Sequence, residues 1–449
     1  MTQKRKIAVI GAGLAGSSAA LGFLNAGFSV TLYSDKPRKA LRDESPATGT
    51  AIYFGQPSQD ADAEIIEDLY GDESYADGFS MRAYNEDKTP LLAFDTDYRY
   101  YRAQAVDVRL RSDDRLGRFI ERGGDFRVET VTPEALDAIA ASHDLTLVAT
   151  GKQGLSDLFA VDEDRTVYKT PQRHLLTVNV AGLGYDGETF DYRSKVGWKH
   201  NLFTAHATEG EIFTGPLLHK EGGQSWVLLG FAKPGGDWQK RFAEASDPAS
   251  ALSIFKKIFH DYFPEDAAEI DKLQVIESDP HTWLKGAVTP TVRKPVGYTK
   301  GGHVVAALGD TAISFDPIAG QGAQNVSIQV AALVKAAKTR QGPFDAAWIT
   351  DQFDAHWEKH GYGATEATRL FLGDPKYAEH AGLLFPSAAV NQKKGGAAFF
   401  RFLGEPSLIA SLQTKGAFTK YIEAETGETI ENLLSRFVPA ESFAARDSA

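Results

Sequence analysis

The chain has 449 residues, of which 43% are apolar and 24% are charged, and this balance is typical of a soluble globular protein with more than one lobe. Its formal net charge of −12 argues against a nucleic-acid-binding surface, which would need a basic stripe. Because the chain contains no cysteine, disulfides, thiolate nucleophiles, iron–sulfur clusters and cysteine-ligated zinc are excluded, and any redox chemistry must come from a cofactor.

The first residues do not resemble a secretory signal. Basic residues at positions 4–6 are followed by only four apolar residues before Gly11, and no run of about 18 apolar residues occurs anywhere in the chain. We therefore expect a cytoplasmic protein without a membrane or nucleic-acid partner.

The first 35 residues predict a strand, a glycine turn, a helix and a second strand. The apolar run at residues 7–10 is typical of a parallel strand covered on both faces. Residues 14–26 favour a helix with Gly27 as its C-cap, and residues 29–33 favour the second strand. This βαβ order is typical of the opening of an α/β domain.

Later segments predict a sheet-rich region followed by further α/β structure and then by helices. Alternation over residues 175–230 predicts an antiparallel sheet, and the chain beyond residue 345 is mostly helix-forming. The other predicted strands are at 50–54, 79–84, 145–149 and 303–308, and the predicted helices are at 106–121, 248–262 and 321–339. This order indicates a nucleotide-binding domain that is interrupted by a sheet domain.

Residues 11–16 read GAGLAG, which is the pattern G-x-G-x-x-G between the first strand and the first helix. The first glycine allows a tight turn, the second lets the main chain approach a pyrophosphate, and the third allows the helix to pack on the strand. The helix N-terminus adds free N–H groups and a partial positive charge. The acid expected at the end of the second strand is replaced by Ser34, and Asp35 follows it. The alternative for the glycine pattern is a tight turn that binds no nucleotide, and the alternative for Asp35 is a simple turn residue.

A second glycine signature lies at residues 309–325, GDTAISFDPIAGQGAQN. A strand leads into Asp310, a loop carries Pro317, and a helix begins near Gln321. Such a helix N-terminus would stabilise the negative charge that a flavin ring gains on reduction, and Asp310 could accept a hydrogen bond from a ribityl or ribose hydroxyl. The alternative is an unrelated glycine loop before a helix.

The second signature, about 300 residues after the first, resembles that of the flavoprotein monooxygenases of the p-hydroxybenzoate hydroxylase fold. Self-sufficient members carry an aspartate–glycine pair that serves both FAD and NAD(P)H, but residues 147–152 lack this aspartate. They are instead similar to the oxygenase component of styrene and indole monooxygenases. The narrower resemblance also rests on AVDVRL at 105–110, KTPQR at 169–173, KGAVTP at 285–290 and DPIAGQGA at 316–323, and it runs from residue 5 to about residue 340.

The resemblance implies an FAD-dependent monooxygenase of a two-component system. A separate NADH-dependent flavin reductase would supply reduced FAD as a diffusible co-substrate, and the oxygenase would react with O2, form a C4a-hydroperoxide and epoxidise an aryl alkene such as indole or styrene. The resemblance also suggests a homodimer. Two alternatives are a self-sufficient NAD(P)H-dependent aromatic hydroxylase and a non-catalytic FAD-binding protein.

The resemblance also assigns site residues, and we expect no metal ligand among them. Pro317 would pack at the flavin edge, and Thr48 and Gly49 belong to the segment that should line an apolar substrate cavity. Aromatic residues of the sheet domain, Phe203, Phe213 and Trp226, face the flavin in one reading and belong to the ordinary core in the other. The expected cofactor contacts are Gly11, Ala12, Gly13, Leu14, Ala15, Gly16, Ser34, Asp35, Arg109, Ala149, Thr150, Gly151, Asp310, Pro317, Gly320, Gln321, Gly322, Ala323 and Asn325.

Two interpretations concern single side chains outside the glycine signatures. Arg109 is expected at the FAD phosphate or ribityl chain, with a surface arginine as the alternative. His356 and His360 lie four residues apart on a predicted helix, but no glutamate stands at position 357, so we expect a solvated helix face and not a metal site.

Together these patterns predict an α/β fold, in which a Rossmann-like FAD/NAD(P)-binding domain carries an inserted mixed β-sheet domain and a helical C-terminus. The predicted boundaries are 1–165 for the first part of the FAD-binding domain (with 46–101 partly in the substrate domain), 166–285 for the substrate-binding sheet domain, 286–345 for the second part of the FAD-binding domain and 346–449 for the C-terminal helices.

Overall fold

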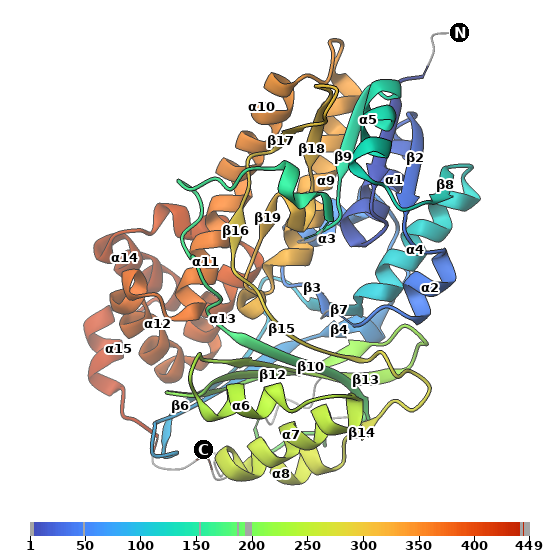
Figure 1. Cartoon of the computed structure of the whole chain (residues 1–449). Coiled ribbons are helices and arrows are strands. Elements are labelled where there is room, and N and C mark those ends of the chain that lie inside the picture. The colour runs from blue at the N-terminus through green and yellow to red at the C-terminus, as the bar shows by residue number, and fades with distance from the viewer. Residues whose placement is uncertain are drawn as a thin grey trace.

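A six-stranded sheet forms the centre of the upper half of the molecule in Figure 1. The computed structural model describes residues 4–47, 50–151, 154–185, 188–193, 200–440 and 443. The strand order is β17-β18-β9-β1-β2-β8, and every neighbouring pair is parallel except β17 with β18. The strands are β1 Lys6–Ile10, β2 Ser29–Ser34, β8 Asp125–Val128, β9 Leu145–Val148, β17 Val296–Tyr298 and β18 Val304–Ala307.

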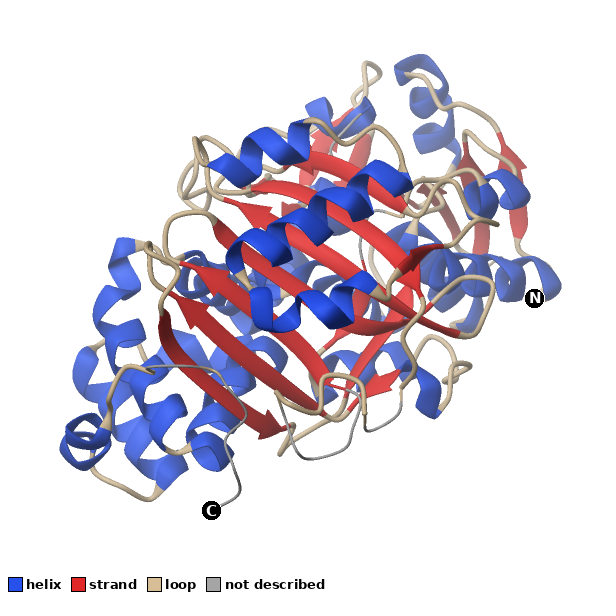
Figure 2. Cartoon of the chain, turned by 90° about the horizontal axis from the view of Figure 1, so that it is seen from below, coloured by secondary structure: helices blue, strands red, loops and turns tan. Residues whose placement is uncertain are grey.

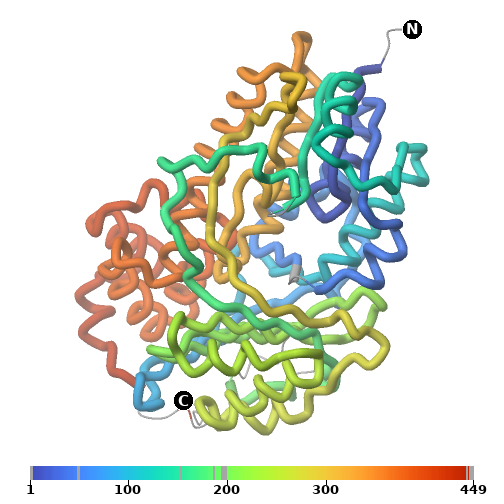
Figure 3. Tube along the Cα trace, in the orientation of Figure 1, coloured from blue at the N-terminus to red at the C-terminus, as the bar shows by residue number. Residues whose placement is uncertain are grey.

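Alternate side chains of β1 explain why helices cover both faces of this sheet. Ile7 and Val9 pack among α1 (Leu14–Asn25), α4 (Val108–Glu121) and α9 (Gln321–Thr339). Ala8 and Ile10 point to the other face, where they meet α5 (Pro133–Ser142). The dark blue α1 and the orange α9 lie side by side in Figures 1 and 3, although about 300 residues separate them.

An eleven-stranded sheet lies below the first sheet in Figure 1. Its main order is β14-β10-β13-β12-β11-β5-β6, with β15 beside β10 and with β7 joining β12, β3 and β4. Most of the β10–β13 region is antiparallel as expected, but β11 pairs in parallel with β5. The strands are β3 Thr50–Tyr53, β4 Tyr75–Ala76, β5 Gly78–Tyr84, β6 Pro90–Asp97, β7 Ala103–Asp107, β10 His174–Ala181, β11 His200–His206, β12 Gly210–Leu218, β13 Gln224–Ala232, β14 Gln274–Val275 and β15 Trp283–Ala287.

The two faces of the large sheet have different covers. Helices α6 (Asp237–Ala243), α7 (Pro248–Tyr262) and α8 (Pro264–Asp271) cross its outer face, as Figure 2 shows. The inner face packs against the loop before α9 and against the C-terminal helices. These are α11 Tyr362–Leu372, α12 Ala378–Val390, α13 Gln392–Gly404, α14 Lys415–Thr426 and α15 Ile430–Arg436, whereas α10 Ala346–His356 and the π-helical turn Trp357–Gly361 pack with the six-stranded sheet.

The remaining elements are short. They are α2 Arg38–Asp43, α3 Gln56–Ala63, a two-stranded sheet of β16 Thr291–Val292 and β19 Ile313–Ser314, and 3-10 helices at Asp72–Ser74, Gly154–Leu158, Gly309–Thr311, Pro317–Ala319, Pro375–Tyr377 and Pro406–Ser411. Within the part of the chain that the structure describes, no helix is both long and apolar enough to cross a membrane.

The expected α/β class is confirmed, and one predicted boundary is wrong. The helix expected from residue 106 begins at Val108, because residues 106 and 107 belong to β7 and pair with β3. Asp107 ends the strand and caps the helix, since its carboxylate accepts a hydrogen bond from the main-chain N–H of Arg109 at 2.9 Å.

Candidate functional site

The two glycine signatures meet where the strands of the six-stranded sheet end. Gly309 has a φ of +60°, and a Cβ added there would lie 2.6 Å from the Cβ of Ala15 in the first turn of α1. Gly11 turns the chain at φ +101°, where an added Cβ would lie 2.5 Å from the carbonyl oxygen of Ala149. At Gly16 an added Cβ would lie 1.7 Å from the carbonyl oxygen of Gly11. Glycine at these positions therefore lets three segments approach one another.

Two other glycines face open space and not protein. An added Cβ would meet nothing within 4 Å at Gly13, the N-cap of α1, or at Gly322, the second residue of α9. Both lie at helix N-termini, where main-chain N–H groups have no helical partner and the helix dipole is positive. A bare main chain beside open space at two such ends fits the pyrophosphate and the flavin ring of FAD.

The chain between these glycines is fixed by main-chain and hydroxyl contacts. The N–H of Ala149 donates to the carbonyl of Ile10 at 2.8 Å. The N–H of Gly151 donates to the Thr311 hydroxyl, which donates in turn to the Gly151 carbonyl, each at 3.0 Å. The segments 11–16, 149–151 and 309–311, which hold most of the expected cofactor contacts, therefore lie together.

The end of β2 is less suited to hold a ribose. Ser34 is buried, and its hydroxyl accepts a hydrogen bond from the N–H of Lys36 at 3.2 Å. Asp35 is exposed. The only acid at this strand end thus lies one residue beyond the position that dinucleotide-binding domains normally use.

The loop before α9 is held by one of its own side chains and by the first residue of α9. The buried Asp316 accepts a hydrogen bond from the N–H of Ile318 at 3.1 Å, which supports the 3-10 turn at Pro317. Gly320 has a φ of +59°, and an added Cβ there would lie 2.6 Å from the Phe54 ring. Gln321 is fully buried, and its amide donates to the Ala319 carbonyl at 2.7 Å. Its amide nitrogen is therefore already used within the protein.

Gln324 is a residue of this site that the sequence patterns did not single out. Its amide nitrogen donates to the carbonyls of Gly320 and Leu403, at 3.1 and 2.9 Å. Its amide oxygen accepts from the N–H of Phe54 at 3.0 Å and from the Ser58 hydroxyl at 3.1 Å. One buried side chain thus joins the glycine loop, the end of β3 and the end of α13.

Arg109 is buried and already held by acids. Its guanidinium lies 2.7 Å from Asp107 and 2.7 Å from Asp279. Asp279 also lies 3.0 Å from His219 and 3.3 Å from Lys220. Burial alone would favour the protonated acid, but hydrogen bonds from His219 and Arg109 hold the pKa of Asp279 well below its usual range. Contact of Arg109 with a phosphate, which stays a prediction, would have to compete with these partners.

This ionic cluster also holds the chain that leads to the expected catalytic segment. Arg109 donates to the Ser45 carbonyl at 3.3 Å, and Lys220 donates to the Arg42 carbonyl at 3.2 Å. The main-chain N–H of Ala47 donates to the carbonyl of His281 at 2.9 Å. Thr48 and Gly49, which together with Pro317 are the catalytic candidates, lie outside the described residues.

The inner face of the large sheet presents apolar side chains toward the glycine loop. Phe213 is buried there in the same cluster as Ile318, and Phe203, Leu175 and Leu229 are partly buried against this cluster. Trp226 does not belong to this face, which corrects one reading of the sequence. It precedes Val227, an inner-face residue, so the alternation of a strand turns it outward, where it packs against Phe190.

The expected solvated face at His356 and His360 is wrong. Both side chains are buried, because α10 and the π-helical turn pack against α9. The Nε2 atom of His356 lies 2.7 Å from Oδ1 of Asn325, one of the expected cofactor contacts. Burial lowers the pKa of His356 to about 3 and that of His360 to about 4, so both imidazoles are neutral. No group of three or more His, Asp or Glu side chains suited to a metal ion occurs among the described residues.

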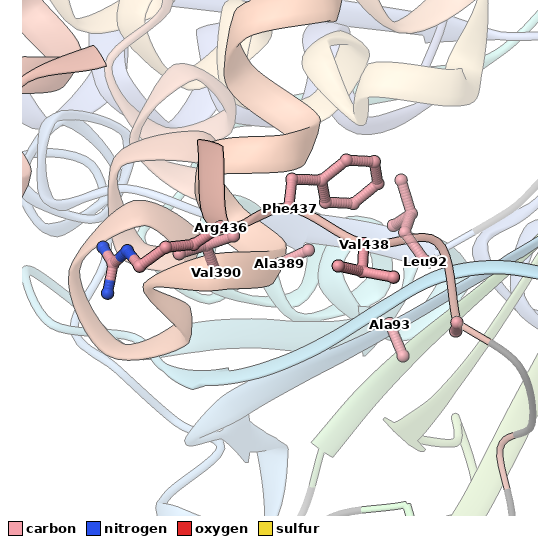
Figure 4. Close-up of a pocket in the computed structure, with 8 residues that line it drawn as sticks. Leu92, Ala93, Ala389, Val390, Arg436, Phe437 and Val438 are labelled. Atoms are coloured by element: carbon pink, nitrogen blue, oxygen red, sulfur yellow. The ribbon is translucent and has the colours of Figure 1, made fainter. Parts of the chain in front are cut away.

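A cavity of about 310 Å³ lies apart from these residues, between β6, α12 and the chain after α15 (Figure 4). Its lining side chains are apolar except for Arg436, whose guanidinium points away from the others in Figure 4 and pairs with Glu428. None of the expected site residues lines it. The lining residues are Leu92, Ala93, Ala389, Val390, Arg436, Phe437, Val438 and Ala440.

The sequence is similar to known proteins over much of its length. Residues 151–268 match the protein family described as "Styrene monooxygenase A putative substrate binding domain". Over 334 residues the chain is 26% identical to the styrene monooxygenase StyA of Pseudomonas sp. and 24% identical to that of Pseudomonas fluorescens, with 72% of this chain and 75% of each relative covered. The chain is thus similar to styrene monooxygenases, and these matches support an FAD-dependent monooxygenase.

Solved structures support the fold of this oxygenase. It is similar to a flavoprotein/dehydrogenase from Cytophaga hutchinsonii, with a TM-score of 0.61, 12% identity, and 94% and 99% of the two chains covered. The flavin-dependent brominase Bmp2 gives a TM-score of 0.58 at 14% identity, with 94% and 98% covered. A tetrameric 2-methyl-3-hydroxypyridine-5-carboxylic acid oxygenase gives 0.55 at 15% identity, with 90% and 97% covered. At these identities the likeness establishes the fold alone.

Proposed function

We propose that this chain is the oxygenase component of a two-component epoxidase, which uses reduced FAD from a separate NADH-dependent flavin reductase, and O2, to epoxidise an aryl alkene such as styrene or indole. The observation that carries the proposal is the family match over residues 151–268, because this segment contains β10–β13, whose inner face packs beside the loop before α9. In balanced form, the alkene, O2 and reduced FAD give the epoxide, water and oxidised FAD.

The open helix ends support an assignment of the two halves of FAD. The pyrophosphate would lie at Gly13, where the first turn of α1 offers unpaired N–H groups, and the flavin ring would lie at Gly322 and the first turn of α9. Bound reduced FAD supplies the two electrons with which O2 is activated. The main-chain N–H groups of the protein would orient the ring and stabilise its negative charge.

The substrate side needs a dry and apolar surface more than it needs a general acid. The partly buried side chains of Phe203, Leu175 and Leu229 offer such a surface on the inner face, and Pro317 lies in the loop that packs against it. Water excluded from this space cannot divert the oxygen toward hydrogen peroxide. An apolar planar substrate without a charged group matches these walls.

Exchange of FAD with a reductase requires a cofactor that leaves readily. The buried Ser34 and the exposed Asp35 support this, because an acid that lies beyond the strand end holds a ribose less firmly than one at the strand end. Ser34→Glu should therefore tighten FAD binding in a fluorescence titration, and an unchanged affinity would contradict the argument.

The lack of a direct NADH site is supported at Thr150–Gly151. The aspartate that self-sufficient relatives use there is absent, and the N–H and carbonyl of Gly151 are both hydrogen-bonded to the Thr311 hydroxyl.

We also propose the division into an FAD-binding domain of residues 1–165 and 286–345, a substrate domain of residues 166–285 and a C-terminal helical region of residues 346–449.

The proposal is tested by NADH consumption with and without a reductase. Purified protein mixed with FAD, NADH and styrene or indole should oxidise NADH no faster than free FAD does, and added flavin reductase should start epoxide formation. Rapid NADH oxidation without reductase would identify a self-sufficient hydroxylase. FAD binding without any oxygenated product, with the reductase present and a panel of aryl alkenes and sulfides, would identify a non-catalytic flavin-binding protein.

A further inference from the structure

Polar side chains in the first turns of α9 are held by the C-terminal helical region. Gln321 and Gln324 both donate to the Leu403 carbonyl, at 3.0 and 2.9 Å, and Asn325 contacts Nε2 of His356 at 2.7 Å. These three residues share the first two turns of α9 with Gly322, where an added Cβ would meet nothing within 4 Å. Only the Asn325 contact is made by a side chain of the C-terminal region, so it is the one that a substitution can remove cleanly.

A π-helical turn follows His356 in the chain. It spans Trp357–Gly361, between α10 and α11, and it packs against α9. His356 and His360 both lie in the interior, with ring centroids 5.7 Å apart. π-helical turns are rare and occur frequently at functional sites, where an extra residue redirects the side chains that follow.

The state of His356 fixes the direction of its hydrogen bond. Burial lowers its pKa to about 3, so the ring is neutral and carries one proton. With Asn325 Oδ1 as the partner, the Nε2–H of His356 donates and the amide oxygen accepts. This bond holds the Asn325 oxygen at α10, so the NH2 group of the same planar amide is turned away from His356.

The Asn325 side chain lies near the N-terminal end of α9, where the flavin is proposed to bind. Helical side chains lean toward the helix N-terminus, so the Asn325 side chain extends over the turn that contains Gln321 and Gly322. We propose that His356 is a positioning residue of the flavin site, which acts through Asn325 by fixing the amide that faces the cofactor at the start of α9. This inference rests on the proposed function, because it assigns a flavin to that helix end.

The experiment compares His356→Leu, His356→Gln and His380→Leu with the unchanged protein. His380 is a matched control, since it is buried in the same region and its Nε2 lies 2.9 Å from the Leu412 carbonyl, a contact to which α9 does not contribute. FAD affinity is measured by quenching of flavin fluorescence, stability by thermal unfolding, and hydrogen peroxide is counted per reduced FAD consumed.

We expect His356→Leu to weaken FAD binding about tenfold, the equivalent of one lost hydrogen bond to a buried group, and to raise the peroxide fraction. His356→Gln keeps an N–H donor at a similar reach and should stay within about threefold of the unchanged protein. His380→Leu should lower the unfolding temperature and leave FAD affinity and the peroxide fraction unchanged.

A double substitution tests whether His356 acts through Asn325. The variant with both Asn325→Leu and His356→Leu should bind FAD no more weakly than Asn325→Leu alone, because the second change removes a contact already lost. Additive losses would overturn the proposal, as would equal behaviour of His356→Leu and His380→Leu. If the unchanged protein bound no FAD, the proposed function itself would fail, and the titration separates that outcome from the others.

Discussion

Substitution of Gly309 by alanine tests whether the two glycine signatures approach each other so closely that only glycine fits at this position. The alanine would adopt a φ of +60°, which costs an L-residue about 1–2 kcal/mol. Its Cβ would also lie 2.6 Å from the Cβ of Ala15, and relief of such an overlap costs about 1–3 kcal/mol. Together these effects should lower the free energy of unfolding by about 2–5 kcal/mol.

Two companion variants separate the backbone effect from the overlap. Gly373→Ala at the C-cap of α11 has a φ of +73° with nothing within 4 Å of an added Cβ, so it should lose only about 1–2 kcal/mol. Ala15→Gly removes the opposing methyl group. Although it costs about 1 kcal/mol in a helix by itself, it should restore part of the stability when combined with Gly309→Ala.

The assay is equilibrium urea unfolding followed by far-ultraviolet circular dichroism, with FAD affinity measured on the same samples. Gly309→Ala should also weaken FAD binding, because the overlap pushes the start of α1 away from Asp310. The reasoning is refuted if Gly309→Ala costs no more than Gly373→Ala, or if Ala15→Gly gives no rescue.

Three further predictions follow from single contacts. Gly13→Ala should weaken FAD binding in a fluorescence titration with little loss of stability, since its Cβ meets no protein atom. Gly16→Ala should prevent folding, because its Cβ would overlap the Gly11 carbonyl oxygen. Equal stability of the two variants would contradict this. Asp279→Asn and the buried outer-face control Asp266→Asn should each lower the free energy of unfolding in urea by about 3–5 kcal/mol. Only Asp279→Asn should also lower the amount of epoxide formed per reduced FAD. Identical epoxide yields would count against a role for the Asp279 cluster at the site. The pKa of His360 falls from 6.5 to about 4 on folding, so its contribution to stability is present above pH 6.5 and is lost as the pH falls toward 4. Between pH 7 and pH 5 the free energy of unfolding should therefore fall by about 2 kcal/mol less in His360→Leu than in the unchanged protein. An equal fall in both proteins would refute the pKa shift.

Strongly patterned elements could be predicted from the sequence because their signals are local. The helix at Gln321–Thr339 has its predicted ends, since glycines precede it and a long helix-forming run follows. The start of α4 was missed because residues 106 and 107 extend the helical pattern, and only their pairing with β3 makes them a strand. That pairing joins segments more than 50 residues apart and leaves no mark in the local sequence.

Part of the candidate site could likewise be predicted from the sequence, and part of it could not. Glycine spacing predicted two cofactor-binding turns, and the structure brings them together at Gly309 and Ala15. The contacts of Gln324 with Leu403 and of Asn325 with His356 join residues 79 and 31 positions apart, so spacing alone carries no information about them. The burial of His356 depends on how α10 and the π-helical turn pack on α9, and a pattern of four-residue spacing cannot distinguish that packing from a solvated face.

The central claim, that this chain uses reduced FAD supplied from outside to oxygenate an aryl alkene, has one direct test. FAD is photoreduced without oxygen, mixed with the protein and styrene or indole in the absence of NADH and reductase, and then exposed to O2. The account predicts close to one oxygenated product per reduced FAD, with little hydrogen peroxide. Complete conversion of the reduced FAD to hydrogen peroxide, with no product from either substrate, would contradict it.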